Sequence, residues 1–201
     1  MSARAALSWM VVGLAALLAG CGGGGSSAES TTGGAGGATG TTTGVSGASA
    51  VAPAGFTTYR GRGYELAVPS WKPFVTQSPE GRISTGWSTP GTGNFTILVI
   101  DDPHPGVSLA TAVKTSAQAS RTAYHVTAQT VASARVAGAS DAKLITDYGP
   151  HGVGPYHAVA QHDANLIVAT PGGAMINVLV VSHGAGNPDP TSVIASFRLN
   201  G

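Results

Sequence analysis

Short stretches of alternating apolar and polar residues mark several β-strands along this chain, because alternate side chains of a strand point to opposite faces of a sheet. The stretch 64–69 alternates and ends on proline, which predicts a strand that stops there. The stretch 94–100 is a second predicted strand, with every second residue apolar. We expect 82–89 to pair with it as a hairpin across the Pro-Gly-Thr-Gly turn at 90–93.

Between residues 107 and 121 the apolar spacing lengthens, which predicts an amphipathic helix. Leu109, Val113 and Ala117 recur at four-residue spacing and would form its buried face. Ser108 is the expected N-cap, because its hydroxyl can accept a hydrogen bond from a free backbone N–H of the first turn.

The second half of the chain is predicted to be mostly strand. The stretches 130–136 and 142–148 are expected neighbours across the turn at 138–141. The stretch 156–170 is a long extended segment, and 174–182 is strongly apolar. A Pro-Gly-Gly turn between these two segments predicts a hairpin.

The chain closes with a short predicted helix in which Asp189 is the N-cap and Pro190 the first helical residue. Its buried face would consist of Val193, Ile194 and Phe197. The order of elements is therefore strands, one helix, more strands and a terminal helix. Runs of adjacent strands favour an antiparallel sheet flanked by helices, so the predicted fold class is an α+β sandwich.

An apolar stretch at 5–18 follows Arg4 near the amino end. It is shorter than the roughly 20 residues of helix that a bilayer requires, and it matches the apolar region of a secretory signal. We therefore expect residues 1–20 to be a signal peptide.

Cys21, the only cysteine, directly follows Leu18, Ala19 and Gly20. This run resembles the bacterial lipobox, in which a signal peptidase cuts before the cysteine and a diacylglyceryl group is attached to its sulfur. The resemblance implies a lipoprotein that acyl chains such as palmitate hold at the extracytoplasmic face of the cell membrane. Two alternatives stay open: an ordinary secretory leader that contains a cysteine, and a signal anchor that stays uncut.

Residues 21–55 are almost entirely Gly, Ser, Thr and Ala, and such a segment cannot bury enough apolar surface to offset the entropy of ordering it. We expect a disordered linker between the lipidated cysteine and one folded domain at 56–201. Without residues 1–20, nine basic and nine acidic side chains remain, so a nucleic-acid partner is disfavoured. With a single cysteine no disulfide can form within the chain.

Several of these features together are similar to PsbP-like domains, a superfamily that includes extrinsic proteins of photosystem II and many actinobacterial lipoproteins of the Lpq type. They are the strand 64–69 followed by Trp71, the mid-chain helix, the hairpin-rich second half and the closing Ile-Ala-Ser-Phe-Arg at 194–198. Family members often carry Pro-x-Gly-Trp after the first long strand, where this chain has Pro-Ser-Trp. The resemblance covers about 56–199. It implies an antiparallel sheet flanked by helices, a protein-binding or accessory role and no shared catalytic residues.

The motifs of common catalytic machinery are missing from the sequence. There is no Gly-x-Ser-x-Gly nucleophile elbow and no Gly-x-x-x-x-Gly-Lys phosphate loop. The Gly-Arg-Gly at 61–63 lacks the third glycine of a dinucleotide-binding fingerprint and the helix that should follow it. Cys21 would be consumed by the lipid. We therefore predict no catalytic residue and no cofactor.

Four histidines fall in the second half: His151, His157, His162 and His183. Neutral imidazole is a common ligand for zinc or copper. Residues five apart on one strand point to opposite faces, so His157 and His162 would converge only at a bulge or turn. Few carboxylates lie nearby in the sequence. We predict scattered surface or loop histidines and no metal site.

Two further groups of residues have a functional and a structural interpretation. Asp101 and Asp102 precede a Pro-His-Pro run, and adjacent residues at a strand end point in different directions, so we expect a polar connection and not a catalytic pair. Trp71 and Trp87 are candidates for the wall of an apolar ligand pocket. Packing in the core or on a sheet face is the favoured alternative for both.

The leading functional prediction is a noncatalytic, lipid-anchored binding or accessory protein with a protein partner in the cell envelope. The second hypothesis is a carrier of an apolar envelope ligand near Trp71 or Trp87, and the third is a hydrolase that uses one of the histidines. An enclosed apolar cavity would favour the carrier, and converging His, Asp and Ser side chains would favour the hydrolase. A solid core with an exposed apolar patch would favour the binding protein.

Overall fold

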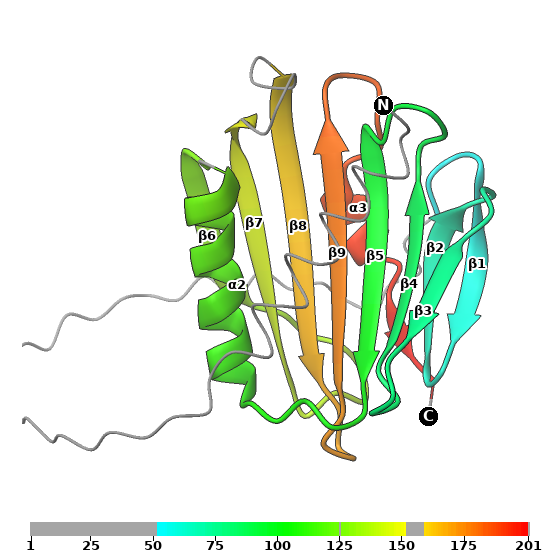
Figure 1. Cartoon of the computed structure of the whole chain (residues 1–201), viewed down its shortest axis with the longest axis vertical. Helices are drawn as coiled ribbons and strands as arrows, with labels where there is room; N and C mark the ends of the chain where they lie inside the picture. The colour runs from blue at the N-terminus through cyan, green and yellow to red at the C-terminus, as the bar shows by residue number, and fades with distance from the viewer. Residues whose placement is uncertain (1–51, 125, 152–158, 201) are drawn as a thin grey trace, which may run out of the picture. The chain divides into compact units, whose positions relative to one another are not determined.

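The computed structural model describes residues 52–124, 126–151 and 159–200, which form two antiparallel sheets and two helices (Figure 1). The smaller sheet has the strand order β1-β2-β10. Its strands are β1 (Phe56–Gly61), β2 (Tyr64–Pro69) and β10 (Arg198–Leu199).

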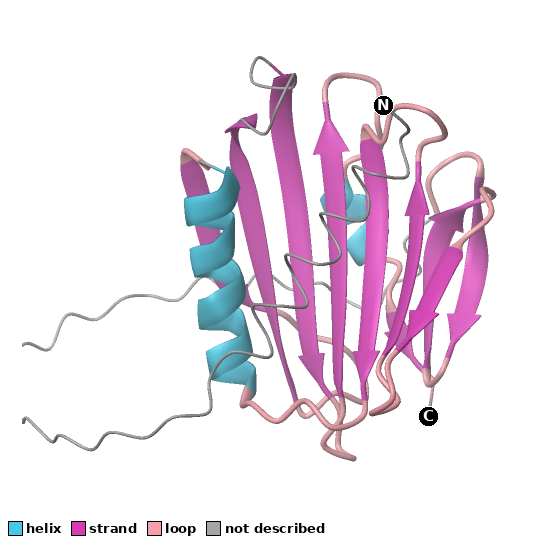
Figure 2. Ribbon diagram, viewed as in Figure 1, coloured by secondary structure: helices cyan, strands magenta, loops and turns pink. Residues whose placement is uncertain are grey.

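The larger sheet has seven strands in the order β3-β4-β5-β9-β8-β7-β6. Its strands are β3 (Phe74–Gln77), β4 (Ile83–Ser88), β5 (Phe95–Asp102), β6 (Ala128–Ser133), β7 (Asp141–His151), β8 (Val159–Ala169) and β9 (Met175–His183). Helix α2 (Leu109–Tyr124) follows β5, and helix α3 (Pro190–Ile194) follows β9. Figure 2 shows α2 in front of the seven-stranded sheet and α3 behind it. We call the face that carries α2 the front face and the opposite face the back face.

The predicted α+β class with an antiparallel sheet is confirmed in this coarse form. Strands dominate the described residues, and one helix lies on each face of the larger sheet. The flanking helices are fewer than the predicted sandwich implied. On the back face the second layer is largely the three-stranded sheet and not a layer of helices.

The main core lies between the back face and the three-stranded sheet. Trp87, Ile97 and Val99 of the larger sheet are almost completely buried there, because alternate residues of β4 and β5 point to this side. Leu66 of β2 faces them from the smaller sheet. Val193 and Ile194 form the buried face of the closing helix as predicted and pack into the same core. Phe197 is buried there too, but the helix ends at Ile194, so Phe197 lies beyond it and not on its face.

A second, smaller core lies between α2 and the front face. The predicted helical stripe is confirmed, since Val113 and Ala117 are buried and Leu109 is partly buried against the sheet. Ile145 of β7 and Ile167 of β8 receive this stripe. Consequently α2 packs on β7 and β8.

Both predicted helix caps are present. Ser108 Oγ accepts a hydrogen bond from the backbone N–H of Thr111 at 3.2 Å, as an N-cap of α2 should. Asp189 Oδ1 accepts one from the backbone N–H of Thr191 at 2.8 Å and caps α3, whose first residue is Pro190. These side chains fix where the two helices begin.

The predicted hairpins are confirmed with small changes in their ends. Strands β4 and β5, β6 and β7, and β8 and β9 pair antiparallel as expected. In the last hairpin the N–H of Thr170 donates to the carbonyl of Ala174 at 2.9 Å, and Gly173 adopts a φ of 83° that favours glycine. Sequence reasoning missed three strands: β1, β3 and β10.

Several predictions concern parts of the chain that lie outside the described residues. They are the signal peptide at 1–20, Cys21 with Leu18, Ala19 and Gly20, most of the linker at 21–55, and the start of the segment 156–170. In the part of the chain that is described, no helix is both long enough and apolar enough to cross a membrane.

Candidate functional site

The front face is covered by α2 on one side only. A row of directly opposed residues crosses the rest of it: Phe74, Gly86, Leu98, Leu179 and Asn165. The ring of Phe74 lies on Gly86, where a β-carbon would overlap it. Leu98 and Leu179 are half-buried, and Figure 2 shows no helix in front of β5, β4 and β3 within the described residues. We call this row the open row of the front face.

A polar cluster lies on the front face beside α2. Gln129 of β6, Asp147 of β7 and Asp163 of β8 oppose one another across three strands. Gln129 Nε2 donates to Asp147 Oδ1 at 2.8 Å and to the carbonyl of Ala117 in α2 at 3.0 Å. Gln161 Nε2 donates to Asp163 Oδ2. Gln129, Asp147, Gln161 and Asp163 form what we call the front-face polar cluster.

The carboxyl group of Asp163 is protonated at neutral pH. Burial raises its pKa to about 8, and the charge of Asp147 adds to the rise. The hydrogen bonds from Gln161 and from the backbone of Ser182 lower this pKa, but by less than burial raises it. The cluster can therefore hold or release a proton close to physiological pH.

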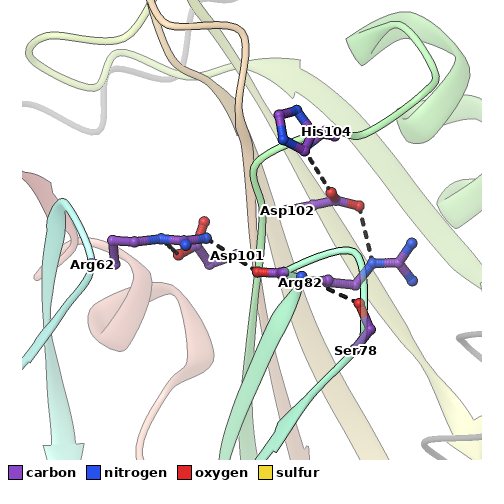
Figure 3. A network of polar contacts seen from close by, with 7 residues as sticks. Arg62, Ser78, Arg82, Asp101, Asp102 and His104 are labelled. Carbon is purple, nitrogen blue, oxygen red and sulfur yellow. Dashed lines mark hydrogen bonds and ion pairs between the residues drawn. The ribbon is translucent and has the colours of Figure 1, made fainter.

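Asp101 and Asp102 point to opposite faces at the end of β5, and each pairs with a different arginine (Figure 3). Arg62, in the turn between β1 and β2, donates to Asp101 Oδ2 at 2.8 Å. Arg82, directly before β4, donates to Asp102 Oδ2 at 3.0 Å. The backbone N–H of His104 donates to the other oxygen of Asp102. These bonds tie loops to the sheet, as expected for a polar connection.

The bond to buried Asp101 raises the pKa of the Arg62 guanidinium. Arg62 also reaches the carbonyl of Gly81 at 3.4 Å. The turn of the small sheet is thus held to the larger sheet by one charged side chain.

Trp71 and Trp87 both take part in aromatic packing. Trp87 is only 1% exposed and meets the ring of Tyr59 edge to face at a centroid distance of 4.8 Å. Trp71 is partly buried and lies edge-on to Phe95 at 6.4 Å. Such pairs contribute about 0.5–1.5 kcal/mol beyond their buried area. Their placement corresponds to the packing alternative of the sequence analysis.

A cavity of about 420 Å³ lies at the connection between β6 and β7. Residues 134–137 and 139–142 line it, and neither tryptophan is among them. Its lining contains the charged side chains of Arg135 and Asp141 beside apolar ones. It therefore differs from the enclosed apolar cavity that a carrier would need.

His162 and Asp189 come together behind the sheet, where His162 Nδ1 lies 3.7 Å from Asp189 Oδ1. Tyr148 stacks on the His162 ring at 4.2 Å, and Ser182 is directly opposite His162 on β9. These are the residue types of a serine hydrolase. However, His162 Nε2, the atom that would take the serine proton, is buried without a hydrogen-bond partner among the described residues.

His183 follows Ser182 on β9, so its side chain points to the opposite face of the sheet. Burial lowers the pKa of His183, so its ring is neutral at neutral pH. His157 lies outside the described residues, and only the backbone of His151 is described. In residues 52–124, 126–151 and 159–200 no three His, Cys, Asp or Glu side chains are grouped closely enough to hold a metal ion.

Comparisons with known proteins provide no family. No family model matches the chain, and no curated protein matches it. Among solved structures, the chain is similar to the crystal structure of PA94, a protein of unknown function from Pseudomonas aeruginosa. The two are 12% identical, the match covers 69% of this chain and 86% of that chain, and the TM-score is 0.36. A TM-score this low carries no argument about function.

Sequence reasoning missed most of the polar side chains described above. Gln129 and Gln161 belong to no motif. Only the strand register reveals that Gln129 meets Asp147 and that Asp147 opposes Asp163, whereas Gln161 and Asp163 share a face because they are two residues apart on β8. In the sequence, Arg62 stands out only as part of Gly-Arg-Gly. Its position between two glycines predicts a turn, and a charged residue in a turn either faces solvent or pairs with an opposite charge. That reasoning could have predicted an ion pair for Arg62.

Proposed function

We propose that this chain is a noncatalytic, lipid-anchored binding or accessory protein of the cell envelope. In this proposal, residues 1–20 are removed, Cys21 carries the lipid, and the segment up to residue 55 gives the folded domain its reach. The domain itself is proposed to be PsbP-like. An antiparallel sheet with a helix on each face supports this, as does Trp71 packing on the core after Pro69.

The observation that carries the binding role is the open row of the front face. Leu98 and Leu179 are half-buried apolar side chains in the middle of a wide sheet, and Phe74 extends the row to β3. Contiguous apolar surface on a folded domain marks sites of protein interaction. We therefore propose that a protein partner binds across β9, β5 and β4.

The alternatives have less support. A carrier would need a ligand space beside Trp71 and Trp87, but both rings are engaged with other aromatic side chains. A hydrolase would need a proton path from Ser182 to His162 Nε2, and that atom has no hydrogen-bond partner in the described part of the chain.

Site-specific photocrosslinking in intact cells tests the binding role. A photoreactive benzophenone amino acid replaces Leu98 in one variant and Val75 in the control. Val75 is 59% exposed on the edge strand β3, so it is more accessible to solvent than Leu98. We expect a discrete protein adduct from position 98 and none from position 75. A lipid adduct from position 98 would support the carrier instead, and no adduct there would refute the proposed surface.

A further inference from the structure

The strand β6 is an edge strand without the usual protection against pairing. Its sequence, Ala-Gln-Thr-Val-Ala-Ser, contains neither a charge nor a proline, although natural sheets commonly guard their edges with Lys, Pro or very short strands. The opposite edge does follow that rule, because β3 has only four residues and lies between Pro73 and Pro79. Of the two edges of the larger sheet, the contrast singles out β6 as the one whose outer side no described residue pairs with and no charge or proline guards.

The register fixes which backbone groups of β6 point outward. The N–H of Ala134 donates to the carbonyl of Ala142 at 2.9 Å, and hydrogen-bonded pairs alternate along an antiparallel ladder. Every second residue back from Ala134 therefore faces β7. It follows that Gln129, Val131 and Ser133 direct their N–H and C=O groups away from the sheet, and no described residue pairs with them.

All three of these outward residues find a partner on a second copy of the strand in only one antiparallel register, and a slide by two residues would leave only two of them paired. When two β6 strands run antiparallel with Val131 opposite its symmetry mate, Gln129 opposes Ser133 of the other copy. Each of these opposed pairs can exchange two backbone hydrogen bonds. A shift by one residue would bring an outward group against an inward one and lose them.

The side chains around β6 suit this symmetric pairing. Val131 is 48% exposed, and it would meet its own mate at the two-fold axis. Lys143 Nζ reaches over β6 to Ser133 Oγ at 2.9 Å. This ammonium group also pairs with Asp141 Oδ1 at 3.4 Å. In the paired register Ser133 opposes the polar Gln129 of the other copy, so polar side chains meet on both sides of the axis.

The helices leave room for the contact. Because α2 packs on β7 and β8 and strands are spaced about 4.8 Å apart, the two α2 axes would lie about 19 Å apart. Packed helices need only about 8–10 Å.

We propose that two copies of this chain associate through antiparallel β6–β6 pairing centred on Val131, which joins their larger sheets into one continuous sheet. The proposal does not depend on the proposed function. A six-residue edge buries less than the roughly 1,200 Å² of a standard interface, so the dimer should be reversible and should depend on protein concentration. It would leave the open row of the front face accessible on both copies.

Disulfide trapping tests the pairing. The protein is the full chain, in mild detergent, with Cys21→Ser so that the introduced cysteine is the only thiol. Directly opposed residues of a hydrogen-bonded pair have Cα atoms about 5.5 Å apart, which a disulfide can bridge. We expect Val131→Cys to form a disulfide-linked dimer under mild oxidation.

Two control variants measure how much disulfide-linked dimer forms through random collisions. The mates of Thr130→Cys would lie diagonally, about 7–8 Å apart or more, and Val75→Cys lies on the opposite edge. We expect at least a tenfold lower yield of dimer from both. Equal yields from the three variants, or no dimer from Val131→Cys, would overturn the proposal. Cross-links in cells to a different protein in place of a second copy would overturn it as well.

Hydrogen exchange on the chain without an introduced cysteine tests the same pairing without relying on variants that could fail to fold. Hydrogen exchange at the amides of Gln129, Val131 and Ser133 should slow as the protein concentration rises, because pairing protects them. Exchange rates that are the same at low and high concentration would exclude the β6 dimer. In Val131→Lys, two ammonium groups would meet at the axis, and the concentration dependence should disappear.

Discussion

At the scale of single residues, Asp163 gives the chain a pH-dependent stability. The pKa of this carboxyl is about 8 in the folded protein and about 3.9 when it is exposed. Between these values the folded state holds a proton that the unfolded state has released, so stability falls as pH rises. We expect a slope of at most about 1.4 kcal/mol per pH unit from this one group between pH 4 and pH 8.

Urea unfolding at several pH values measures this slope. Asp163→Asn keeps the size of the side chain and removes its titration, so the variant should lose the decline between about pH 4 and pH 8. Wild-type and variant profiles that run parallel over this range would contradict a raised pKa at Asp163.

Two arginines close together in the sequence should differ in their contribution to stability. Arg62 pairs at 2.8 Å with Asp101, whose side chain is 7% exposed, whereas Arg60 lies 3.7 Å from the more exposed Glu65. Arg62→Ala would leave a buried carboxylate without its partner. Because half of the Arg62 side chain is in solvent, we expect a loss of about 1–2 kcal/mol in the free energy of unfolding.

Arg60→Ala is the matched control for this ion pair, and we expect it to leave the free energy of unfolding nearly unchanged. Denaturant titration of both variants decides the matter. Equal effects of the two substitutions would show that the Arg62–Asp101 bond does not hold the turn of the small sheet.

At the scale of elements, the cap of α3 can be tested apart from its charge. Asp189 Oδ1 accepts from both the N–H and the hydroxyl of Thr191 at 2.8 Å, so Asp189→Ala should cost about 1 kcal/mol. Asp189→Asn keeps an N-cap oxygen and should cost much less, although it removes the negative charge beside His162. Thermal unfolding compares them, and equal losses would argue that the negative charge of Asp189 beside His162 matters more than the cap.

Elements with a strong local signal could be predicted from the sequence. Strand β2 has the predicted bounds because its alternation and closing proline are both local, and α3 was found through Asp189 and Pro190. Strands β1, β3 and β10 could not, since most residues of β1 and β3 are not buried and β10 has only two residues. Their pairing depends on contacts with distant parts of the chain, such as the register of β10 with β2.

At the scale of the whole molecule, the aromatic core should dominate stability. Trp87 is nearly completely buried, so Trp87→Ala should cost about 3–5 kcal/mol. Trp71 is only partly buried at the margin of the same core, and Trp71→Ala should cost on the order of 1–2 kcal/mol. Urea unfolding measures both. A well-tolerated Trp87→Ala would instead indicate a space that a ligand normally fills.

The candidate site was harder to predict than the fold. In the sequence, Leu98 and Leu179 look like ordinary apolar strand residues. Only the strand order, together with the packing of α2 on β7 and β8, shows that the open row is not covered by that helix. The front-face polar cluster depends on Gln129, Asp147 and Asp163 meeting across three strands. A sequence pattern gives the face of each residue but not its neighbours across strands.

The proposal that the domain works on a membrane depends on the chemistry of Cys21. Mass spectrometry of the amino-terminal peptide, from protein isolated from its native membrane fraction, tests it most directly. We expect a peptide that begins at Cys21 and carries the added mass of a diacylglyceryl group. A peptide that still contains residues 1–20, or an unmodified thiol at Cys21, would contradict the lipid anchor.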